Sequence, residues 1–344
     1  MTAATRAPDD LDVPALTAYL AATLDGIGPA LTLTRLGGGQ SNPTYFLDTG
    51  ERRLVLRKRP AGTLLPSAHA IDREYRVQAA LRDTGVAVPE MVHFCTDERI
   101  IGTQFYVMER VEGRVLHDNA LPGIPTPERR AYFDALALML ARIHAVDISG
   151  VGLGDYGRSH GFAARQIARW TRQWQLSRTA DNASMDRLID WLPRNLPDDD
   201  QTTLVHGDFR LGNVMFHPTE PRIVAVLDWE LSTLGHPLAD LAHSCIYTWM
   251  MRPDEYGRGL SDVDVAAAGL PDMDSFTRRY FDASGQTGPL TRFYLVLALF
   301  RNAVIFEGIA ARARQGNAAS DDATEVGRLA PALAARAADL TADA

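Results

Sequence analysis

The first third of the chain alternates hydrophobic and polar positions in the manner of β-strands. A period of two residues turns one face of each strand toward a core, and short turns separate the segments. The expected strands cover residues 31–36, 44–47, 54–57, 91–94 and 104–109. Between the third and the fourth, residues 68–81 show helical spacing and end before Gly85 and Pro89. We therefore expect an antiparallel five-stranded sheet with one helix.

Beyond Gly113 the hydrophobic positions recur every three or four residues, which is typical of amphipathic helices. The first of these helices, residues 126–146, opens with a Thr-Pro start signal. Further helices are expected at residues 162–176, 237–251, 275–283, 290–313 and 321–338. A short β-like stretch, residues 203–226, lies among them. The pattern predicts an α+β protein with a sheet lobe at residues 1–112 and a larger helical lobe at 113–344.

Composition and charge narrow the class of protein. The 344 residues carry a formal charge of −8 and no basic run, which argues against a nucleic-acid partner. The longest clean apolar run, Phe293 to Phe300, is far shorter than the roughly 20 residues that span a bilayer. No apolar segment follows a basic one near the N-terminus, and Cys95 and Cys245 form no CxxC pair. We expect a cytoplasmic protein without a membrane partner, and the sequence leaves its oligomeric state open.

The strongest chemical signal is the segment His206-Gly-Asp208-Phe-Arg210-Leu-Gly-Asn213, which precedes an apolar stretch ending at Asp228. In phosphoryl transfer, an Asp accepts the proton of the substrate hydroxyl, while an Asn and a second Asp hold Mg²⁺. The spacing from His206 to Asn213 matches the kinase catalytic loop H-x-D-x-x-x-x-N. The segment therefore predicts Asp208 as catalytic base, with Asn213 and Asp228 as magnesium ligands.

Two other interpretations of these residues stay open at this point. Each Asp can cap a turn, as Asp commonly does in loops. Alternatively, His206, Asp208, Asp228 and His236 supply the donor types of a hydrolytic zinc site. The zinc interpretation gives Asn213 no task and leaves the sheet lobe unexplained.

A glycine-rich turn joins the first two expected strands. It runs through Gly38, Gly39, Ser41 and Asn42, where backbone N–H groups can approach phosphate oxygens closely. A strand follows the turn, whereas a Rossmann or Walker loop opens a helix. The turn suits a hairpin that covers a nucleotide, although such a turn is also a common hairpin connection.

The third expected strand ends in two cations, Arg57 and Lys58, and Lys58 is the only lysine of the chain. Kinases pair a cation on this strand with a helix Glu to hold the nucleotide phosphates. Side chains alternate along a strand, so Val55 and Arg57 share one face. This favours Arg57 with Glu74 as the phosphate-anchoring pair and turns Lys58 away. The alternative is an ordinary surface ion pair.

Together these features resemble the aminoglycoside phosphotransferase and choline kinase branch of the protein-kinase-like fold. The segments LVHGDFRLGNVMF and VLDWELS carry the resemblance, which extends from about residue 31 to about residue 249. In GGGQSNPTYFL, VLRKRPAGTLLPSAHAIDREYRV, FYVMERVEG and LSTLGHPLADLA, the chain is similar to the kinase-like domain that accompanies acyl-CoA dehydrogenase modules. The resemblance implies a two-lobed kinase that uses ATP and Mg²⁺.

Residue by residue, the resemblance implies Asp208 as base and Asn213 and Asp228 as magnesium ligands. It also implies a set of nucleotide-binding residues, whose last three form the hinge at adenine: Gly38, Gly39, Ser41, Asn42, Arg57, Glu74, Met108, Glu109 and Val111. Asp240 and His206 are implied to support the catalytic loop.

Departures from protein kinases indicate a small-molecule acceptor. Asp228-Trp-Glu replaces the DFG triplet, and no activation segment follows. Arg210 is a candidate catalytic cation for the transferring phosphoryl group, or it pairs with a nearby acid. Near the acceptor it would repel an aminoglycoside but tolerate a hydroxyacyl-CoA. The Trp- and Arg-rich residues 165–196 either receive an anionic, partly apolar acceptor or belong to the core. An aminoglycoside kinase and a silent nucleotide-binding pseudokinase are the alternatives.

Overall fold

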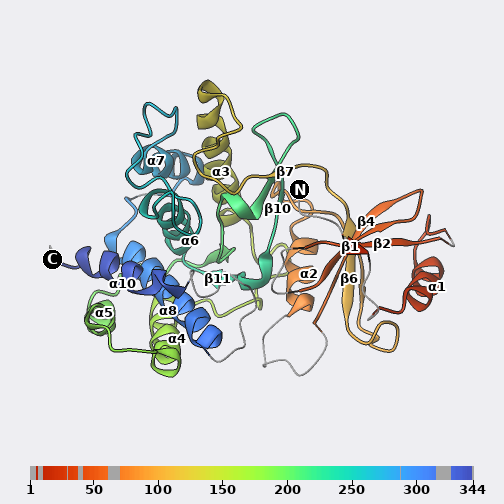
Figure 1. Cartoon of the computed structure of the whole chain (residues 1–344), viewed down its shortest axis with the longest axis horizontal. Coiled ribbons are helices and arrows are strands. Elements are labelled where there is room, and N and C mark those ends of the chain that lie inside the picture. Colours follow the sequence, from red (N-terminus) through yellow and green to blue (C-terminus); the bar gives the residue numbers. More distant parts are fainter. Residues whose placement is uncertain are drawn as a thin grey trace. The chain divides into compact units, whose positions relative to one another are not determined.

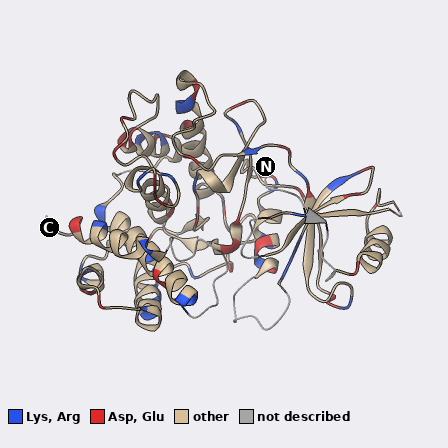
Figure 2. Ribbon diagram, in the orientation of Figure 1, with Lys and Arg blue, Asp and Glu red and all other residues tan. Residues whose placement is uncertain are grey.

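The computed structural model describes residues 5–6, 11–28, 30–37, 42–60, 70–286, 288–314 and 327–342. The chain divides into two compact units (Figure 1). The first unit comprises Met1–Glu112 together with Asp228–Glu230, and the second comprises Gly113–Leu227 and Leu231–Ala344. Figure 2 shows acidic and basic residues interspersed along both units.

The first unit is built on a six-stranded sheet in the order β1-β2-β3-β4-β6-β5, with every neighbouring pair antiparallel. Its strands are β1 (Thr5–Arg6), β2 (Thr32–Arg35), β3 (Thr44–Asp48), β4 (Arg53–Lys58), β5 (Met91–Cys95) and β6 (Phe105–Glu109). The prediction of five strands and one helix is therefore wrong, because it omits strand β1 and helix α1. The two-residue β1 is too short to carry a period-two pattern.

Helix α1 (Val13–Thr23) is one of the elements that the sequence pattern did not predict, as is α5 (Ala183–Arg194) of the second unit. The Asp12 side chain caps it by accepting a hydrogen bond from the Ala15 amide at 2.9 Å. Leu16 and Leu20, one helical turn apart, are fully buried against the sheet. Burying such a leucine contributes about 1.5–3 kcal/mol.

Helix α2 (Ile71–Ala80) lies on the other side of the sheet from α1 (Figure 1). Alternation along β4 divides its side chains between these two sides. Leu54 and Leu56 belong to the core that includes α1, whereas Arg57 reaches Glu74 of α2. The register of β4, fixed by pairing with β3 and β6, thus directs Arg57 to the α2 side.

The second unit is mainly helical. Its helical segments are η1 (Thr126–Glu128), α3 (Arg129–His144), α4 (Phe162–Ser177), α5 (Ala183–Arg194), α6 (Pro237–Cys245), the π-helical η4 (Ile246–Met250), α7 (Met273–Ser284), α8 (Arg292–Arg314) and α10 (Leu329–Asp339). The predicted helix 126–146 is confirmed as η1 followed by α3. Of the predicted helix 321–338, residues 321–326 lie outside the described part of the chain.

Small sheets flank residues 206–213 of the second unit. One has the order β10-β9-β7 and the other pairs β11 with β8. Their strands are β7 (Arg114–Val115), β8 (Thr203–Val205), β9 (Val214–Phe216), β10 (Ile223–Val226) and β11 (Thr233–Gly235). The His206–Asp208 segment directly follows β8, and Asp228 follows β10 after one residue. The ends of these short paired strands therefore fix the positions of the His206–Asp208 segment and of Asp228.

Helix α8 is long and apolar enough, by length and composition alone, to cross a membrane. Its 23 residues extend past the apolar run 293–300 through Arg301 and Asn302. Within the second unit, 72% of its most apolar window is buried, and the helix packs against α4, α6 and α10. This is the environment of a core helix.

Candidate active site

One buried carboxylate holds the backbone of the candidate catalytic loop, residues 206–213, which follows β8. Asp240 of α6 accepts hydrogen bonds from the amides of His206 at 2.6 Å and Gly207 at 2.8 Å. Gly207 has φ +85°, and a Cβ there would lie 2.6 Å from the Leu231 carbonyl oxygen. Only glycine fits this left-handed, tightly packed position. The loop geometry therefore depends on both Gly207 and Asp240.

The Asp208 carboxylate is gripped on both of its oxygens. Oδ2 accepts a hydrogen bond from Asn213 Nδ2 at 2.8 Å, and the same nitrogen donates to the Asp208 carbonyl at 2.8 Å. Oδ1 lies 2.7 Å from His243 Nε2 and 3.5 Å from Arg210 Nε. The structure thus brings together three predicted residues, Asp208, Asn213 and Arg210, with His243, which was not predicted.

Electrostatics keep Asp208 ionised. Burial opposes ionisation, but the hydrogen bond from His243 and the positive charge of Arg210 outweigh it and hold the pKa of Asp208 well below its usual range. An ionised carboxylate is the form that can accept a hydroxyl proton.

His206 supports the loop through both ring nitrogens. Its Nε2 donates to the Leu227 carbonyl at 2.8 Å, and its Nδ1 accepts from the Asp208 amide at 3.2 Å, an assignment that follows from these partners. His236 Nε2 is directed toward Asp199 at 3.4 Å. Within the described ranges, no group of three or more His, Cys, Asp or Glu side chains is arranged to hold a metal. The zinc interpretation is therefore not supported.

In the first unit, Arg57 forms an ion pair with Glu74. Arg57 Nε lies 3.0 Å from Glu74 Oε2, and Arg57 Nη2 lies 3.8 Å from Asp228 Oδ1. Burial raises the pKa of Glu74 to about 7, while the positive charge of Arg57 acts in the opposite direction. Asp228 has φ +64°, a strained conformation for a residue with a side chain. Lys58 is buried and, by strand alternation, shares the other face of β4 with Leu56.

The predicted nucleotide-covering residues are only partly described. Gly38, Gly39 and Ser41 lie outside the described residues, whereas Asn42 is buried just before β3.

The predicted hinge begins at the end of β6. Met108 and Glu109 are the last two residues of that strand, and Val111 follows it. The Glu109 amide donates to the Glu90 carbonyl at 2.9 Å. This bond occupies the Glu109 amide.

Arg210 lies among aromatic rings as well as beside Asp208. Its guanidinium carbon is 5.6 Å from the ring centre of Tyr247 and 5.8 Å from that of Tyr256. Both distances are within the range of cation–π attraction. Two roles were considered for Arg210, a cation for the transferring phosphoryl group and the ion-pair partner of a nearby acid. The geometry is compatible with both, because the acid that Arg210 faces is the candidate base itself.

The tryptophans of the Trp- and Arg-rich segment have different environments. Trp174 is buried, and Trp191 stacks on Phe293 with ring centres 6.5 Å apart. Trp170 is different: Arg169 and Arg301 lie 5.0 and 5.7 Å from its ring centre. Among the tryptophans of residues 165–196, Trp170 is therefore the one with arginine cations beside its ring.

Arg301, on α8, contributes a cation near the catalytic loop. Its Nε is buried and has no hydrogen-bond partner among the described residues. Burial lowers the pKa of Arg301, while the charges of Asp208 and Asp240 raise it. The guanidinium thus stands within electrostatic reach of the candidate base.

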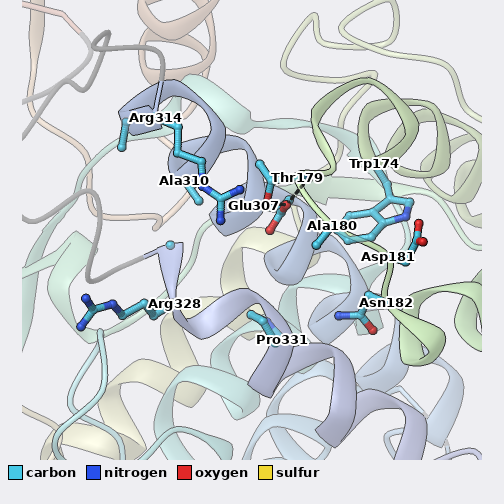
Figure 3. A pocket seen from close by; sticks show the side chains of 12 residues that line it. Trp174, Thr179, Ala180, Asp181, Asn182, Glu307, Ala310, Arg314, Arg328 and Pro331 are labelled. Carbon is cyan, nitrogen blue, oxygen red and sulfur yellow. Dashed lines mark hydrogen bonds between the residues drawn. The ribbon is translucent and has the colours of Figure 1, made fainter.

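A cavity of about 440 Å³ lies elsewhere in the second unit, between the α4–α5 connection and the helices α8 and α10 (Figure 3). Glu307 points into this region, where its Oε1 accepts hydrogen bonds from the Thr179 amide and hydroxyl, both at 2.6 Å. Asp208, Arg210 and His243 are not among the lining residues. The cavity does not enter the proposed reaction.

Sequence reasoning missed His243. It follows Asp240 by three residues on α6, and residues three apart lie on one face of a helix. Asp240 was expected to support the catalytic loop. A His on the same face of the helix was therefore a signal that His243 would also reach the loop.

Replacing Asp240 with Asn is expected to lower the free energy of unfolding by about 1–3 kcal/mol. The amide would turn an NH₂ group toward one of the two backbone N–H donors. Asp282→Asn, at an exposed position of α7, is the matched control, and denaturant unfolding is the measurement. Equal stability of the two variants would contradict the bracing role.

The same change should alter the pH dependence of stability. Burial acts to raise the pKa of Asp240, but the hydrogen bond of His144, nearby histidine charges and the Gly207 amide lower it overall. The Asp240 contribution is therefore present above the ordinary carboxyl pKa of about 4 and is lost as the pH falls toward the lowered value. Asp240→Asn should remove that acid-sensitive component.

The antiparallel-sheet unit, the helical unit and the catalytic loop define an α+β protein of the protein-kinase-like class, as predicted. Residues 32–289 match the phosphotransferase enzyme family. The chain belongs to this family, and the predicted resemblance is confirmed.

A solved structure similar to this chain is a putative aminoglycoside phosphotransferase from Ralstonia eutropha, with 43% identity, a TM-score of 0.88, and coverage of 97% of this chain and 99% of that one. A second similar structure is aminoglycoside phosphotransferase APH(4)-Ia in a ternary complex with AMP-PNP and hygromycin B. It has a TM-score of 0.63, and the match covers 96% of this chain and 99% of that one. At 18% identity, this likeness shows the fold alone.

Among curated proteins, acyl-CoA dehydrogenase family member 11 of Rattus norvegicus is 45% identical over 90% of this chain and 41% of its own length. Family member 10 of Mus musculus is 43% identical over 89% of this chain and 29% of its own length. The chain thus spans less than half the length of these relatives.

Proposed function

We propose that the protein is an ATP-dependent O-phosphotransferase that transfers the γ-phosphate of MgATP to a hydroxyl group of a small metabolite. The observation that carries the proposal is the Asp208 carboxylate, ionised and held by Asn213 and His243 in the loop after β8. Membership of the phosphotransferase enzyme family supports the reaction class. The acceptor, the nucleotide and the metal are parts of the proposal.

The donor set fits magnesium. Asn213 uses its Nδ2 to hold Asp208, which leaves its side-chain oxygen as a ligand. Asp228 Oδ1 is buried and accepts no hydrogen bond from the described residues. Hard oxygen donors of this kind suit Mg²⁺, so we assign Asn213 and Asp228 to the metal.

Arg57 and Glu74 suit a role at the nucleotide phosphates. Arg57 carries the charge, and Glu74 fixes its direction through the 3.0 Å contact. We assign Met108, Glu109 and Val111 to the adenine through backbone groups, and Gly38, Gly39, Ser41 and Asn42 to the covering turn, on the basis of the family resemblance.

Bound MgATP supplies the electrophilic γ-phosphorus and ADP as the leaving group. Asp208 orients the acceptor hydroxyl and accepts its proton as the acceptor oxygen bonds to phosphorus and the bond to the β,γ-bridging oxygen breaks. Arg210 adds positive charge beside the reacting groups. The chain thus contributes positioning and charge neutralisation, which dominate phosphoryl transfer.

We propose an anionic or neutral acceptor, such as a hydroxyacyl-CoA. Arg210 beside Asp208, and Arg169 and Arg301 around Trp170, would repel a polycation and attract an anion. The similarity to acyl-CoA dehydrogenase family members supports an acyl-CoA-related metabolite. An aminoglycoside acceptor is the second candidate, favoured by the similar protein from Ralstonia eutropha.

The test is incubation of the purified protein with γ-labelled ATP, Mg²⁺ and fractionated metabolites that include hydroxyacyl-CoAs and aminoglycosides. We expect label in an anionic or neutral alcohol. Label in aminoglycosides alone would contradict the acceptor assignment. ATP binding in calorimetry without any label transfer would identify a pseudokinase and overturn the proposed function.

A further inference from the structure

His243 lies outside the motif segments that carry the family resemblance, yet it contacts the candidate base directly. It is 2% exposed on α6 and places its Nε2 2.7 Å from Asp208 Oδ1. The adjacent ring of Tyr247 has its centre 4.8 Å from that of His243. Packing therefore restricts the imidazole to one position against the carboxylate.

The surroundings of the imidazole define which nitrogen carries the proton. Nδ1 is buried and has no hydrogen-bond partner within the described part of the structure. A bare Nε2 would face the carboxylate oxygen with a lone pair, which is repulsive at 2.7 Å. We therefore assign the proton to Nε2, which donates to Asp208. Burial lowers the pKa of His243 more strongly than Asp208 raises it, which favours the neutral ring.

His243 and Asn213 hold different oxygens of the same carboxylate. Asn213 donates to Oδ2 and His243 to Oδ1. A carboxylate held on one oxygen can rotate about its Cβ–Cγ bond, because this torsion is soft. Held on both, its plane is fixed and the remaining lone pairs keep one direction.

We infer that His243 is a positioning residue for phosphoryl transfer: its Nε2–H fixes the plane of the Asp208 carboxylate that receives the acceptor hydroxyl. The inference rests on the proposed function and adds to it a residue that acts only through Asp208. The His243 side chain contacts the Asp208 carboxylate and packs against the Tyr247 ring.

Ser244 separates this role from general support of the loop. It is the next residue of α6, is also buried, and donates through Oγ to the Phe209 carbonyl at 2.6 Å. Ser244 thus holds the backbone of the catalytic loop without touching the Asp208 side chain. A residue that only anchors the loop should behave like Ser244.

The experiment measures kcat and KM for MgATP in His243→Leu, His243→Gln and Ser244→Ala, together with denaturant unfolding. Leu removes the donor, whereas the Gln amide can replace Nε2–H. We expect His243→Leu to lower kcat on the order of 100-fold without changing KM for MgATP, as a misplaced catalytic group does. His243→Gln should recover most of that loss. Ser244→Ala should lower stability with a far smaller change in kcat.

A double-mutant cycle provides the decisive readout. In the Asp208→Asn background, His243→Leu should cause no further loss of the residual transfer, because the group that it positions has been removed. An equal loss in both backgrounds, or wild-type kcat in His243→Leu, would overturn the inference while leaving the proposed function intact. A wild-type protein that transfers no phosphate would instead refute the proposed function, and the inference with it.

Discussion

Replacing Asp208 with Asn is expected to leave MgATP binding intact and to reduce phosphoryl transfer by about 10²–10⁴-fold, the usual contribution of a general base. The amide is nearly isosteric with the carboxylate but cannot take the acceptor proton. It also cannot offer oxygen atoms to both Asn213 and His243, so one of these donors would face an NH₂ group. Calorimetry with MgATP and label transfer measure the two effects separately.

The control for this variant is a measurement of its stability by denaturant unfolding. A folded Asp208→Asn protein that binds MgATP with wild-type affinity isolates the loss to the chemical step. Wild-type turnover in that protein would show that Asp208 is not the base. A protein that has lost MgATP binding would show instead that Asp208 serves the nucleotide or its metal.

The second large effect is expected at Arg57. Arg57→Ala should raise KM for MgATP by roughly 10–100-fold, since a hydrogen bond to a charged group contributes about 1.5–3 kcal/mol. The change also removes the positive charge that opposes the burial-raised pKa of Glu74. Glu74 should then be protonated near neutral pH. Steady-state kinetics with ATP as the varied substrate provide the measurement.

Lys58→Ala is the matched control on the same strand. Lys58 is 3% exposed on the opposite face of β4, so its removal should lower stability while KM for MgATP stays unchanged. Glu74→Gln should resemble Arg57→Ala in direction with a smaller effect, because Arg57 keeps its charge but loses the partner that orients it. A raised KM in Lys58→Ala with normal kinetics in Arg57→Ala would reverse the assignment.

The sheet unit was largely predictable because its pattern is local. Alternation in residues 54–57 was sufficient to separate Arg57 from Lys58, and the pairing of β4 with β3 and β6 agrees with it. Helix α1 was missed although Asp12, Pro14, Leu16 and Leu20 form a cap, a start signal and a buried stripe. Its sequence, VPALTAYLAAT, is apolar on most sides, so the amphipathic period that indicates a helix is weak there.

The catalytic loop was predictable for the same reason, since Asp208 and Asn213 are five residues apart. The support of the carboxylate was not, because His243 lies 35 residues further along the chain, on α6, and reaches Asp208 only through tertiary packing. The zinc interpretation required the side chains of His206 and His236 to converge. Their hydrogen bonds to Leu227 and Asp199 direct the two rings to separate partners.

The most direct test of the central claim is a ³¹P NMR time course of the wild-type protein with MgATP and the acceptor fractions. The account predicts that each γ-phosphate lost from ATP appears as one phosphomonoester of an alcohol, with ADP as the other product. An ATP spectrum that stays unchanged although calorimetry shows binding would contradict it. Conversion of ATP to inorganic phosphate alone would contradict it as well.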